Sequence, residues 1–392
     1  MNNFEPKSLA VFGRLPDLSL AELEALFGSE NVKAAQGAAL LSADTADVPF
    51  KRLGGSVKLA KVLTVLPTNK PAEVFGYLRQ NIPKHLNHLE PGGFTLGLSM
   101  YNYAVAPQEI NRQLLSIKRD IKKTGRPVRI VPNKTADLNS AQVLHNKLTT
   151  RGAWELIALL DGSRTILAQT MFVQDIEAYG DRDQVRPKRD ARVGMLPPKL
   201  AQTMINLTNP PAGGTVLDPF CGTGVLLQES LLMGYSVIGS DIEPRMISYS
   251  RQNMDWLKQK YDFSGQVELF AADATKCRWP AFDVLASEVY LGRPFSRYPD
   301  PQTLKQNISD VNTILKKFLI NAHGQLKDQA RVCLAVPVWR TEGGKLTHLP
   351  MVDHLTEMGY TYLDFKHVRA DRLIYFREGQ TVARQIIALR KL

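Results

Sequence analysis

The sequence has few cysteines, and the three it has lie far apart. Cys221, Cys277 and Cys333 form no C-x-x-C pair, which argues against a disulfide framework and a cysteine zinc site. The seven histidines are also scattered, without the spacing of metal ligands, and we predict no metal site. Free thiols this sparse are typical of a protein in the reducing cytosol.

Long apolar runs are absent as well. No stretch reaches the roughly 18 residues that a membrane span requires. The segment 1–15 contains Glu5 and no sustained apolar core, unlike a secretory signal. No internal repeat or low-complexity tract occurs. These absences predict a soluble cytoplasmic protein without a membrane partner.

Positive charge is present in excess. Among 392 residues, 49 Lys and Arg outnumber 38 Asp and Glu, which gives a net charge of +11. This excess favours a polyanionic partner, nucleic acid above all, because Lys and Arg placed against phosphates release condensed counterions. A basic surface that serves only solubility is the alternative.

The length suits two domains, and an apolar share of 44% is ordinary for globular proteins.

The N-terminal half has the pattern of an α+β region. We expect a strand over 8–15, followed by a helix with Ser19 as its N-cap and Glu22 completing a capping box. Four more strands are predicted over 94–105, 126–134, 154–162 and 164–175, the last two joined by an Asp-Gly turn, with helices over 107–125 and 137–148.

The helix over 107–125 has a basic face that includes Lys118 and Lys122. This face either contacts phosphates or is simply solvated. A strongly charged stretch over 179–192, with Pro187 inside it, predicts a domain boundary near Asp181. The expected domains are therefore 1–180 and 181–392.

The segment 215–234 reads as a strand, a glycine-bearing turn and a helix. Gly222 and Gly224 allow a ligand to approach the backbone, and the helix start offers free N–H groups to a charged group. The next strand ends at Asp241, where a carboxylate can accept from ribose hydroxyls. A further strand leads to Asp273, which can accept from an adenine amino group. Leu227 stands where a dinucleotide site needs its third glycine, which disfavours a nicotinamide cofactor.

These residues resemble the class I methyltransferase pattern, in which D-P-F-C-G-T-G is the form seen in N-methyltransferases of nucleic acids. The resemblance implies S-adenosylmethionine as cofactor, with Asp218 and the glycines at its methionine portion, Asp241 at the ribose and Asp273 at the adenine. A glycine loop that only packs a helix on the sheet is the alternative. The expected cofactor-binding residues are Asp218, Pro219, Phe220, Gly222, Gly224, Asp241, Ile242, Asp273 and Ala274.

The methyl acceptor loop departs from the related enzymes, in which the fourth strand often ends in D-P-P-Y-G. Here the sequence from Asp283 is DVLASEVYLG, which places Glu288 at the acidic position. Glu288 would hold an exocyclic amine whose lone pair is delocalised, and Tyr290 would stack on an extruded base. Aligning Tyr290 with the aromatic position gives Ser287 the polar role instead. A degenerate, noncatalytic loop remains the third interpretation.

Most of the chain resembles the THUMP-containing tRNA guanine-N2 methyltransferases, including those that act on position ten, and the C-terminal half does so more specifically than the N-terminal half. The resemblance rests on 15–28, on 137–148 with 165–183, and on 186–208, where Gly194, Met195 and the residues from Pro197 to Ala201 match G-M-x-P-P-K-L-A. It implies a Rossmann-like C-terminal methyltransferase and an N-terminal THUMP-like module that grips tRNA. The pattern over 372–389 predicts a closing hairpin with a turn at Glu378 and Gly379, which would complete a seven-stranded sheet.

The junction between the two regions is basic and is either an RNA path or a solvated linker. Its candidate RNA-binding residues are Arg182, Arg186, Lys188, Arg189 and Arg192. A noncatalytic RNA-binding protein and a DNA amino-methyltransferase are the competing functions. The target nucleotide, the number of methyl groups added and the need for a partner subunit are left open by the sequence.

Overall fold

The computed structural model describes residues 4–86, 88, 90, 92–190, 195–295, 299–341, 345–377 and 380–392. Gly194, Arg192 and the predicted turn at Glu378 and Gly379 lie outside these residues. The chain forms two compact units. The first comprises residues 1–16, 30–51 and 56–176, and the second comprises residues 17–29, 52–55 and 177–392. The division therefore does not fall at one point of the sequence.

The first unit contains an eight-stranded sheet in the order β2-β3-β1-β4-β8-β7-β5-β6. Its strands are β1 (Ser8–Phe12), β2 (Val32–Ala35), β3 (Ala38–Leu41), β4 (Ser56–Leu66), β5 (Phe94–Tyr101), β6 (Val128–Ile130), β7 (Ala153–Asp161) and β8 (Arg164–Val173), and its helices are α2 (Pro71–Leu86), α3 (Pro107–Lys122) and α4 (Ser140–His145).

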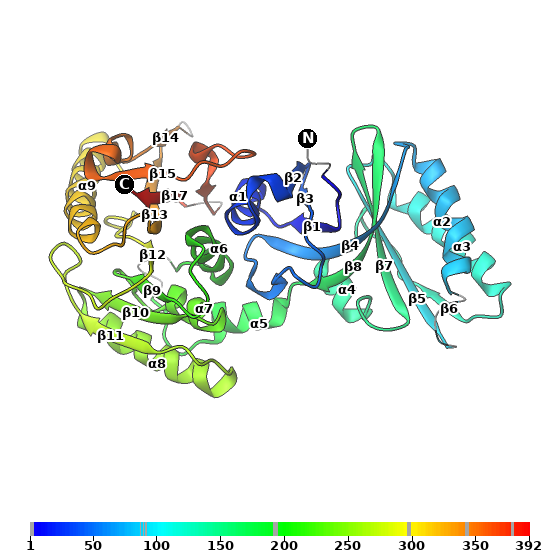
Figure 1. Cartoon of the computed structure of the whole chain (residues 1–392), viewed down its shortest axis with the longest axis horizontal. Coiled ribbons are helices and arrows are strands. Elements are labelled where there is room, and N and C mark those ends of the chain that lie inside the picture. The colour runs from blue at the N-terminus through cyan, green and yellow to red at the C-terminus, as the bar shows by residue number, and fades with distance from the viewer. Residues whose placement is uncertain are drawn as a thin grey trace. The chain divides into compact units, whose positions relative to one another are not determined.

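Helices α2 and α3 lie side by side against the sheet of the first unit (Figure 1). The buried apolar residues of α3, Ile110, Leu114, Ile117 and Ile121, recur at helical spacing and join a core with β5 and β7. The same periodicity leaves Lys122 exposed on the opposite side of the helix and Lys118 partly exposed. The predicted strands over 154–162 and 164–175 form a hairpin in which Asp161 pairs with Arg164.

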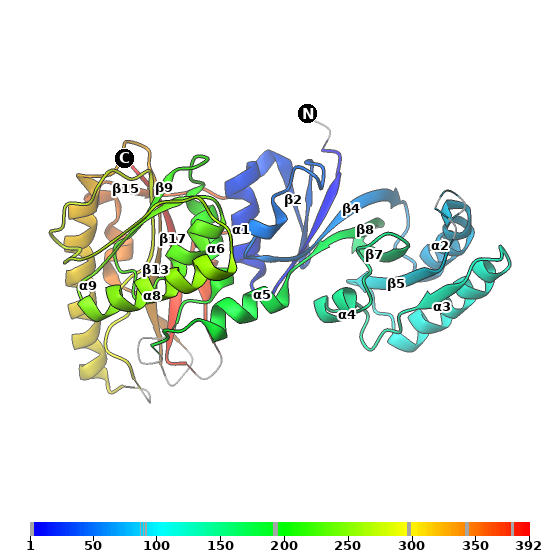
Figure 2. The ribbon, with the colours of Figure 1, turned by 90° about the horizontal axis from the view of Figure 1, so that it is seen from below.

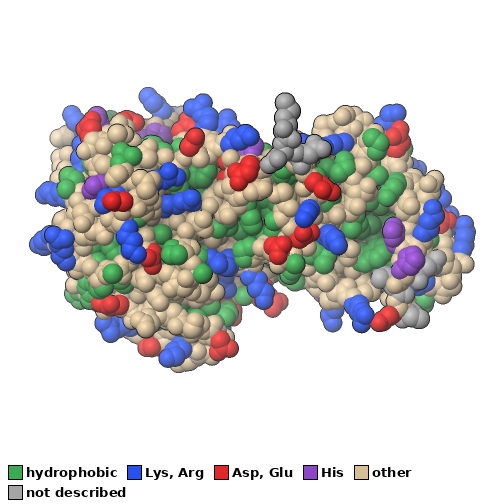
Figure 3. Space-filling view, in the orientation of Figure 1, with side chains coloured by type: hydrophobic (Ala, Val, Ile, Leu, Met, Phe, Trp, Pro, Cys, Tyr) green, Lys and Arg blue, Asp and Glu red, His purple; other side chains and the backbone are tan. Residues whose placement is uncertain are grey.

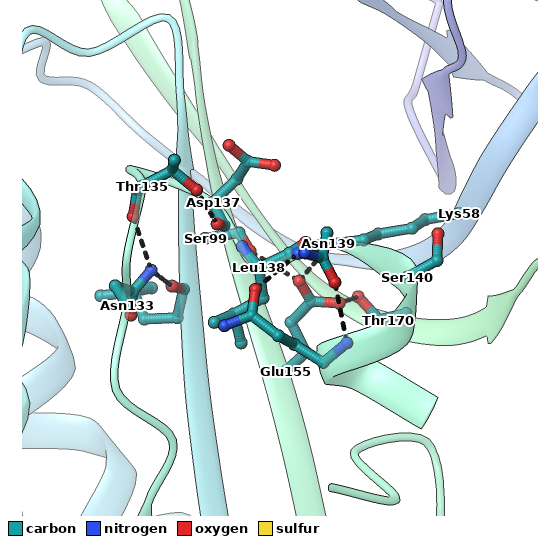
Figure 4. Close-up of polar contacts among 12 residues, drawn as sticks. Lys58, Ser99, Asn133, Thr135, Asp137, Leu138, Asn139, Ser140, Glu155 and Thr170 are labelled. Atoms are coloured by element: carbon teal, nitrogen blue, oxygen red, sulfur yellow. Dashed lines mark hydrogen bonds and ion pairs between the residues drawn. The ribbon is translucent and has the colours of Figure 1, made fainter. Parts of the chain in front are cut away.

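A buried polar network, absent from the sequence predictions, ties the loop before α4 to the sheet (Figure 4). The Lys58 ammonium forms an ion pair with Glu155, and it also donates to the Leu138 carbonyl oxygen at 2.6 Å. The Glu155 carboxylate accepts further hydrogen bonds from Ser99 and Thr170, each 2.6 Å long. Every partner of this pair is thus supplied within the unit, which is the condition for a buried ion pair to be tolerated.

The second unit contains a nine-stranded sheet whose main path runs β11-β10-β9-β12-β13-β17-β15, with β14 on β13 and β16 on β17. Its strands are β9 (Thr215–Asp218), β10 (Ser236–Asp241), β11 (Val267–Ala271), β12 (Val284–Glu288), β13 (Arg331–Arg340), β14 (Leu346–Thr347), β15 (Tyr360–Tyr362), β16 (Ile374–Tyr375) and β17 (Val382–Lys391), and its helices are α1 (Pro16–Phe27), α5 (Ile176–Gly180), α6 (Pro198–Thr208), α7 (Val225–Leu232), α8 (Pro244–Lys260) and α9 (Pro301–His323).

The sheet of the second unit is larger than the predicted seven strands. Seven strands form the main path, and β14 and β16 add two residues each at its margin. Strands as short as these carry no alternation that a sequence pattern can reveal. Figure 2 shows the covering helices α6, α8 and α9, and α9 buries Val311, Leu315, Phe318 and Leu319 against the strands.

The predicted capping box at the first helix is wrong. Helix α1 begins at Pro16, so Ser19 lies inside it and donates its hydroxyl to the Gly55 carbonyl oxygen at 2.9 Å. The Glu22 carboxylate is buried and accepts from the backbone N–H groups of Gly54 and Gly55, each at 2.8 Å. Asn206 of α6 donates to the same carboxylate at 2.7 Å. Ser19 thus binds the segment 52–55, and Glu22 joins α1 to that segment and to α6, which outweighs the local capping preference.

Candidate active site

The order in which successive strands are added to the second sheet reverses at β9. Strands β9, β10 and β11 follow one another outward, and the chain then returns to place β12 on the other side of β9. Pairing along β11-β10-β9-β12 is parallel, so all four carboxyl ends lie at one edge. Ligands of open α/β sheets bind at the carboxyl ends of strands beside such a reversal.

The acidic residues expected at the cofactor converge on this edge. Asp218 ends β9 and Asp241 ends β10, while Asp273 follows β11 by two residues. The backbone N–H of Ala272 donates to the Asp241 carbonyl oxygen at 2.9 Å, which links the ends of β10 and β11. Glu288 ends β12 and, with Asp241, contributes to raising the pKa of Asp218. The four carboxyl groups therefore belong to one region.

Asp218 is 3% exposed. Its carboxylate accepts from the Ser287 hydroxyl at 2.6 Å and from the Phe220 backbone N–H at 3.3 Å. Burial, the largest cause, raises the pKa of Asp218 to about 7. Since Ser287 is fully buried and donates its hydroxyl to Asp218, it is occupied in supporting the end of β9 in this arrangement.

Asp241 holds the glycine loop. Its two carboxylate oxygens accept from the backbone N–H groups of Gly222 and Glu243, each at 2.9 Å. Burial raises the pKa of Asp241 above its ordinary value, against the effect of these two bonds. Next to it, Ile242 is 72% exposed, and an apolar side chain so exposed beside a carboxylate can pack against a flat ring.

The two glycines of the loop differ in what surrounds them. Gly222 has φ +51° and no heavy atom within 4 Å of the position that a Cβ would occupy. Gly224 has φ +81°, and its Cβ would lie 2.9 Å from Ser250 Oγ and 3.0 Å from Met254 Cε. Gly222 therefore leaves open space at the loop, whereas Gly224 allows α7 to approach α8 closely.

Two polar residues of α8, not singled out from the sequence, hold the loop from behind. The Ser250 hydroxyl donates to the Gly222 carbonyl oxygen and the Asn253 amide donates to the Thr223 carbonyl oxygen, both at 2.8 Å. Both side chains are fully buried. Their spacing of three residues, which puts both side chains on one face of a helix, was the available signal.

The remaining predicted cofactor residues vary in exposure. Asp273 accepts from the backbone N–H and the hydroxyl of Thr275 at 2.9 and 2.7 Å, and these bonds lower its pKa. Phe220 packs edge-on against Phe318 of α9 with ring centroids 4.9 Å apart. Pro219 is buried. Ala274 is 4% exposed and packs in the core, so it can offer a ligand only its backbone.

Glu288, expected to hold the acceptor amine, is itself part of an ion pair. Arg384 of β17 forms an ion pair with it, and the side chains are 4% exposed for Arg384 and 15% for Glu288. Burial raises the pKa of Glu288, while Arg384 and Arg377 oppose this rise. Tyr290, the expected stacking residue, is 39% exposed. An arginine inside the apolar strand VARQIIAL was the missed signal.

The predicted RNA-binding residues at the junction divide into buried and accessible ones. Arg182 is 6% exposed and bonds with its Nε to Glu229 at 2.7 Å. Arg186 is 3% exposed, and burial lowers its pKa to about 10. The expectation that these two arginines line an RNA path is corrected: their charges are enclosed by α7 and its neighbours. Arg189 is exposed and Lys188 partly so.

On the face shown in Figure 3, Lys and Arg side chains are scattered among acidic ones and do not form one patch. Within the described ranges, no three His, Cys, Asp or Glu side chains come together as metal ligands would. The helices of the same ranges include none with the length and apolar character of a membrane span.

Residues 186–333 match the family model described as UPF0020: RMKL-like, methyltransferase domain. The tRNA (guanine(10)-N2)-dimethyltransferase of Methanothermobacter thermautotrophicus is 31% identical over 194 residues, which are 49% of this chain and 53% of that protein. The chain thus spans about half the length of this relative. An enzyme of the same description from Methanocaldococcus jannaschii is 39% identical over 95 residues, 23% of this chain and 27% of that protein.

The fold as a whole is similar to that of TrmN from Thermus thermophilus. The crystal structure of that protein superposes with a TM-score of 0.53, covers 99% of this chain and 100% of its own, and is 19% identical. Similarity at this identity concerns the fold, and it extends over both units.

Proposed function

We propose that the protein transfers a methyl group from S-adenosylmethionine to the exocyclic N2 of a guanine in tRNA. The match of residues 186–333 to the model of a UPF0020, RMKL-like methyltransferase domain supports the reaction class. The observation that carries the proposal is the glycine loop held between Asp218 and Asp241 at the carboxyl ends of β9 and β10. The two archaeal relatives, both described as tRNA (guanine(10)-N2)-dimethyltransferases, supply the substrate class.

The residues present fit this cofactor. The open space at Gly222 can admit a ligand close to the backbone, and the start of α7 offers N–H groups to a carboxylate. Asp241 retains lone pairs beyond the two used by backbone N–H groups, so it can accept from ribose hydroxyls. Ile242 is then the candidate to pack against the face of the adenine, and the Asp273 carboxylate is the candidate to accept a hydrogen bond from its amino group.

When bound, S-adenosylmethionine supplies an electrophilic methyl group on a positively charged sulfur. The guanine N2 gains this methyl and loses one proton. Glu288, at the end of β12, is proposed to accept a hydrogen bond from the N2–H group, which would orient the nitrogen lone pair. Tyr290, two residues further on and exposed, is proposed to stack on the extruded base.

The first unit is proposed to be a THUMP-like module that grips tRNA by shape and phosphate contacts. The exposed side of α3, with Lys122 and the partly exposed Lys118, supports this role. Arg189 and Lys188 extend the accessible positive charge in the second unit. The three cysteines are free, which agrees with the proposed cytoplasmic location. The sites of RNA contact and the catalytic roles of Glu288 and Tyr290 are part of this proposal.

A noncatalytic RNA-binding protein is the second candidate, favoured by the ion pair that occupies Glu288. Label transfer separates the two functions. Purified protein with methyl-labelled S-adenosylmethionine is incubated with total tRNA or with duplex DNA. The proposal expects label in tRNA, none in DNA, and loss of label in Glu288→Ala. Protein that binds tRNA and the cofactor but transfers no label supports the scaffold, and label in DNA alone supports a DNA amino-methyltransferase.

A further inference from the structure

Glu288 and Arg384 come from strands that are not neighbours. Glu288 pairs with Ala335 of β13, and Arg384 pairs with Pro337 of the same strand. Since directly paired residues point to the same face of a sheet, and residues 335 and 337 share a face, Arg384 and Glu288 lie on one face. Arg384 reaches across β13 to the carboxyl end of β12.

The contact is made by the Nε atom of Arg384 and the Oε1 atom of Glu288. This single Nε–H···O bond gives one oxygen of the carboxylate a directional partner, which the rotating ammonium of a lysine would do less specifically. The second carboxylate oxygen, Oε2, has no bond from Arg384 in the structure. The ion pair therefore anchors Oε1 of Glu288 and restricts the rotation of the carboxylate.

Arg384 is itself supported by the short strand β16. Tyr375 pairs directly with Arg384 across β16 and β17, and the Arg384 guanidinium carbon lies 5.8 Å from the centroid of its ring. The Tyr375 hydroxyl accepts from Arg377 Nε at 2.9 Å. Strand β16 thus places the Tyr375 ring beside Arg384.

The charges around Glu288 come from three directions. Arg384 from β17 and Arg377 after β16 favour its ionised form, and its burial disfavours that form. Asp218, at the end of neighbouring β9, carries a raised pKa of about 7 to which Glu288 and Asp241 contribute by repulsion. Without its arginine, Glu288 would be a buried carboxyl near the acidic Asp218, and its neutral form would be favoured.

We propose that Arg384 is a positioning residue for methyl transfer, which keeps Glu288 ionised and holds its free oxygen toward the acceptor amine. The inference rests on the proposed function, because it assigns a task to Glu288 in that reaction. A neutral carboxyl would present an O–H donor and fewer lone pairs to the amine, and a carboxylate that rotates freely would lose the direction that makes the amine lone pair available.

The test compares Arg384→Gln, Arg384→Lys and Glu288→Gln, with Arg390→Gln as the control. Arg390 is an exposed arginine on the same strand β17, at its other end. The first readout is infrared spectroscopy, which follows the stretching band of protonated carboxyl groups as the pH is changed. The band that is absent from Glu288→Gln is assigned to Glu288. The second is the single-turnover rate of tRNA methylation, measured from about pH 5.5 to about pH 9 with both substrates saturating.

Arg384→Gln is expected to move the Glu288 titration upward by about 1–3 pH units. Its methylation rate at neutral pH is expected to fall about a hundredfold and to recover as the pH rises and Glu288 ionises. Glu288→Gln should lose activity at every pH. Arg384→Lys keeps the charge and loses the Nε contact, so its rate should fall while its pH midpoint stays near that of the unaltered protein.

An unchanged Glu288 titration in Arg384→Gln, or a loss of rate equal at every pH, would overturn the inference and leave the methyltransferase activity standing. If Arg384→Gln does not fold, Arg384→Lys provides the test. A wild-type methylation rate in Arg384→Lys would contradict a positioning role for Arg384. Unaltered protein that methylates no tRNA would defeat the proposed function instead, and the infrared titration would still measure the effect of Arg384 on Glu288.

Discussion

The two glycines of the cofactor loop allow a prediction with opposite outcomes in two assays. Alanine at Gly222 or Gly224 must adopt a positive φ, at a cost of about 1–2 kcal/mol in each variant. Only at Gly224 does the new methyl group also meet neighbours, at 2.9 Å from Ser250 Oγ and 3.0 Å from Met254 Cε. Overpacking of this kind costs about 1–3 kcal/mol more.

Gly224→Ala is therefore expected to lose about 1–3 kcal/mol more unfolding free energy than Gly222→Ala, as measured by equilibrium urea denaturation of the cofactor-free protein. Affinity for S-adenosylmethionine, measured by calorimetry, should show the reverse order. The methyl group of Gly222→Ala enters open space beside the loop, which is the space assigned to the cofactor. Equal losses of stability would refute the packing argument, and wild-type affinity in Gly222→Ala would refute the assignment of that space.

Three further predictions concern charged groups. Because the pKa of Asp218 rises from 3.8 to about 7 on folding, the folded state binds a proton that the unfolded state releases. Stability should therefore fall as the pH rises through this window, by up to about 4 kcal/mol, and urea denaturation of Asp218→Asn should lack this slope. Glu155→Ala leaves the buried Lys58 charge unpaired and should cost about 3–5 kcal/mol, with Glu155→Gln as the milder control; a loss below about 1 kcal/mol would contradict a buried ion pair. Asp241→Asn should weaken cofactor binding about 10- to 100-fold in calorimetry, and unchanged affinity would remove Asp241 from the site.

The cofactor strand, loop and helix could be predicted from sequence because each local signal agrees with the fold. The strand before Asp218, the glycines and the helix after Gly224 are contiguous, and the structure has β9, the loop and α7 in these places. The end of β10 was also found, since an apolar strand stops at Asp241. Glu288, which ends β12, was found by alignment with the D-P-P-Y-G motif of related enzymes. The residue pattern was sufficient to predict an element wherever the residues that form it are close together in the sequence.

Contacts between distant segments were not predictable in this way. Ser19 and Glu22 match a capping box, yet their side chains bind Gly54, Gly55 and Asn206. The partner of Glu288 is 96 residues away on β17. No spacing rule connects such positions, and a single charged residue in an apolar strand signals only that a partner exists.

The central claim is that the exocyclic N2 of a guanine in tRNA is the methyl acceptor. Its most direct test is mass spectrometry of nucleosides from tRNA that has been incubated with the protein and methyl-deuterated S-adenosylmethionine. The account predicts deuterated N2-methylguanosine or its N2,N2-dimethyl form, lost in Glu288→Ala. Deuterium found only in a methylated adenosine or cytidine, or in no nucleoside, would contradict it.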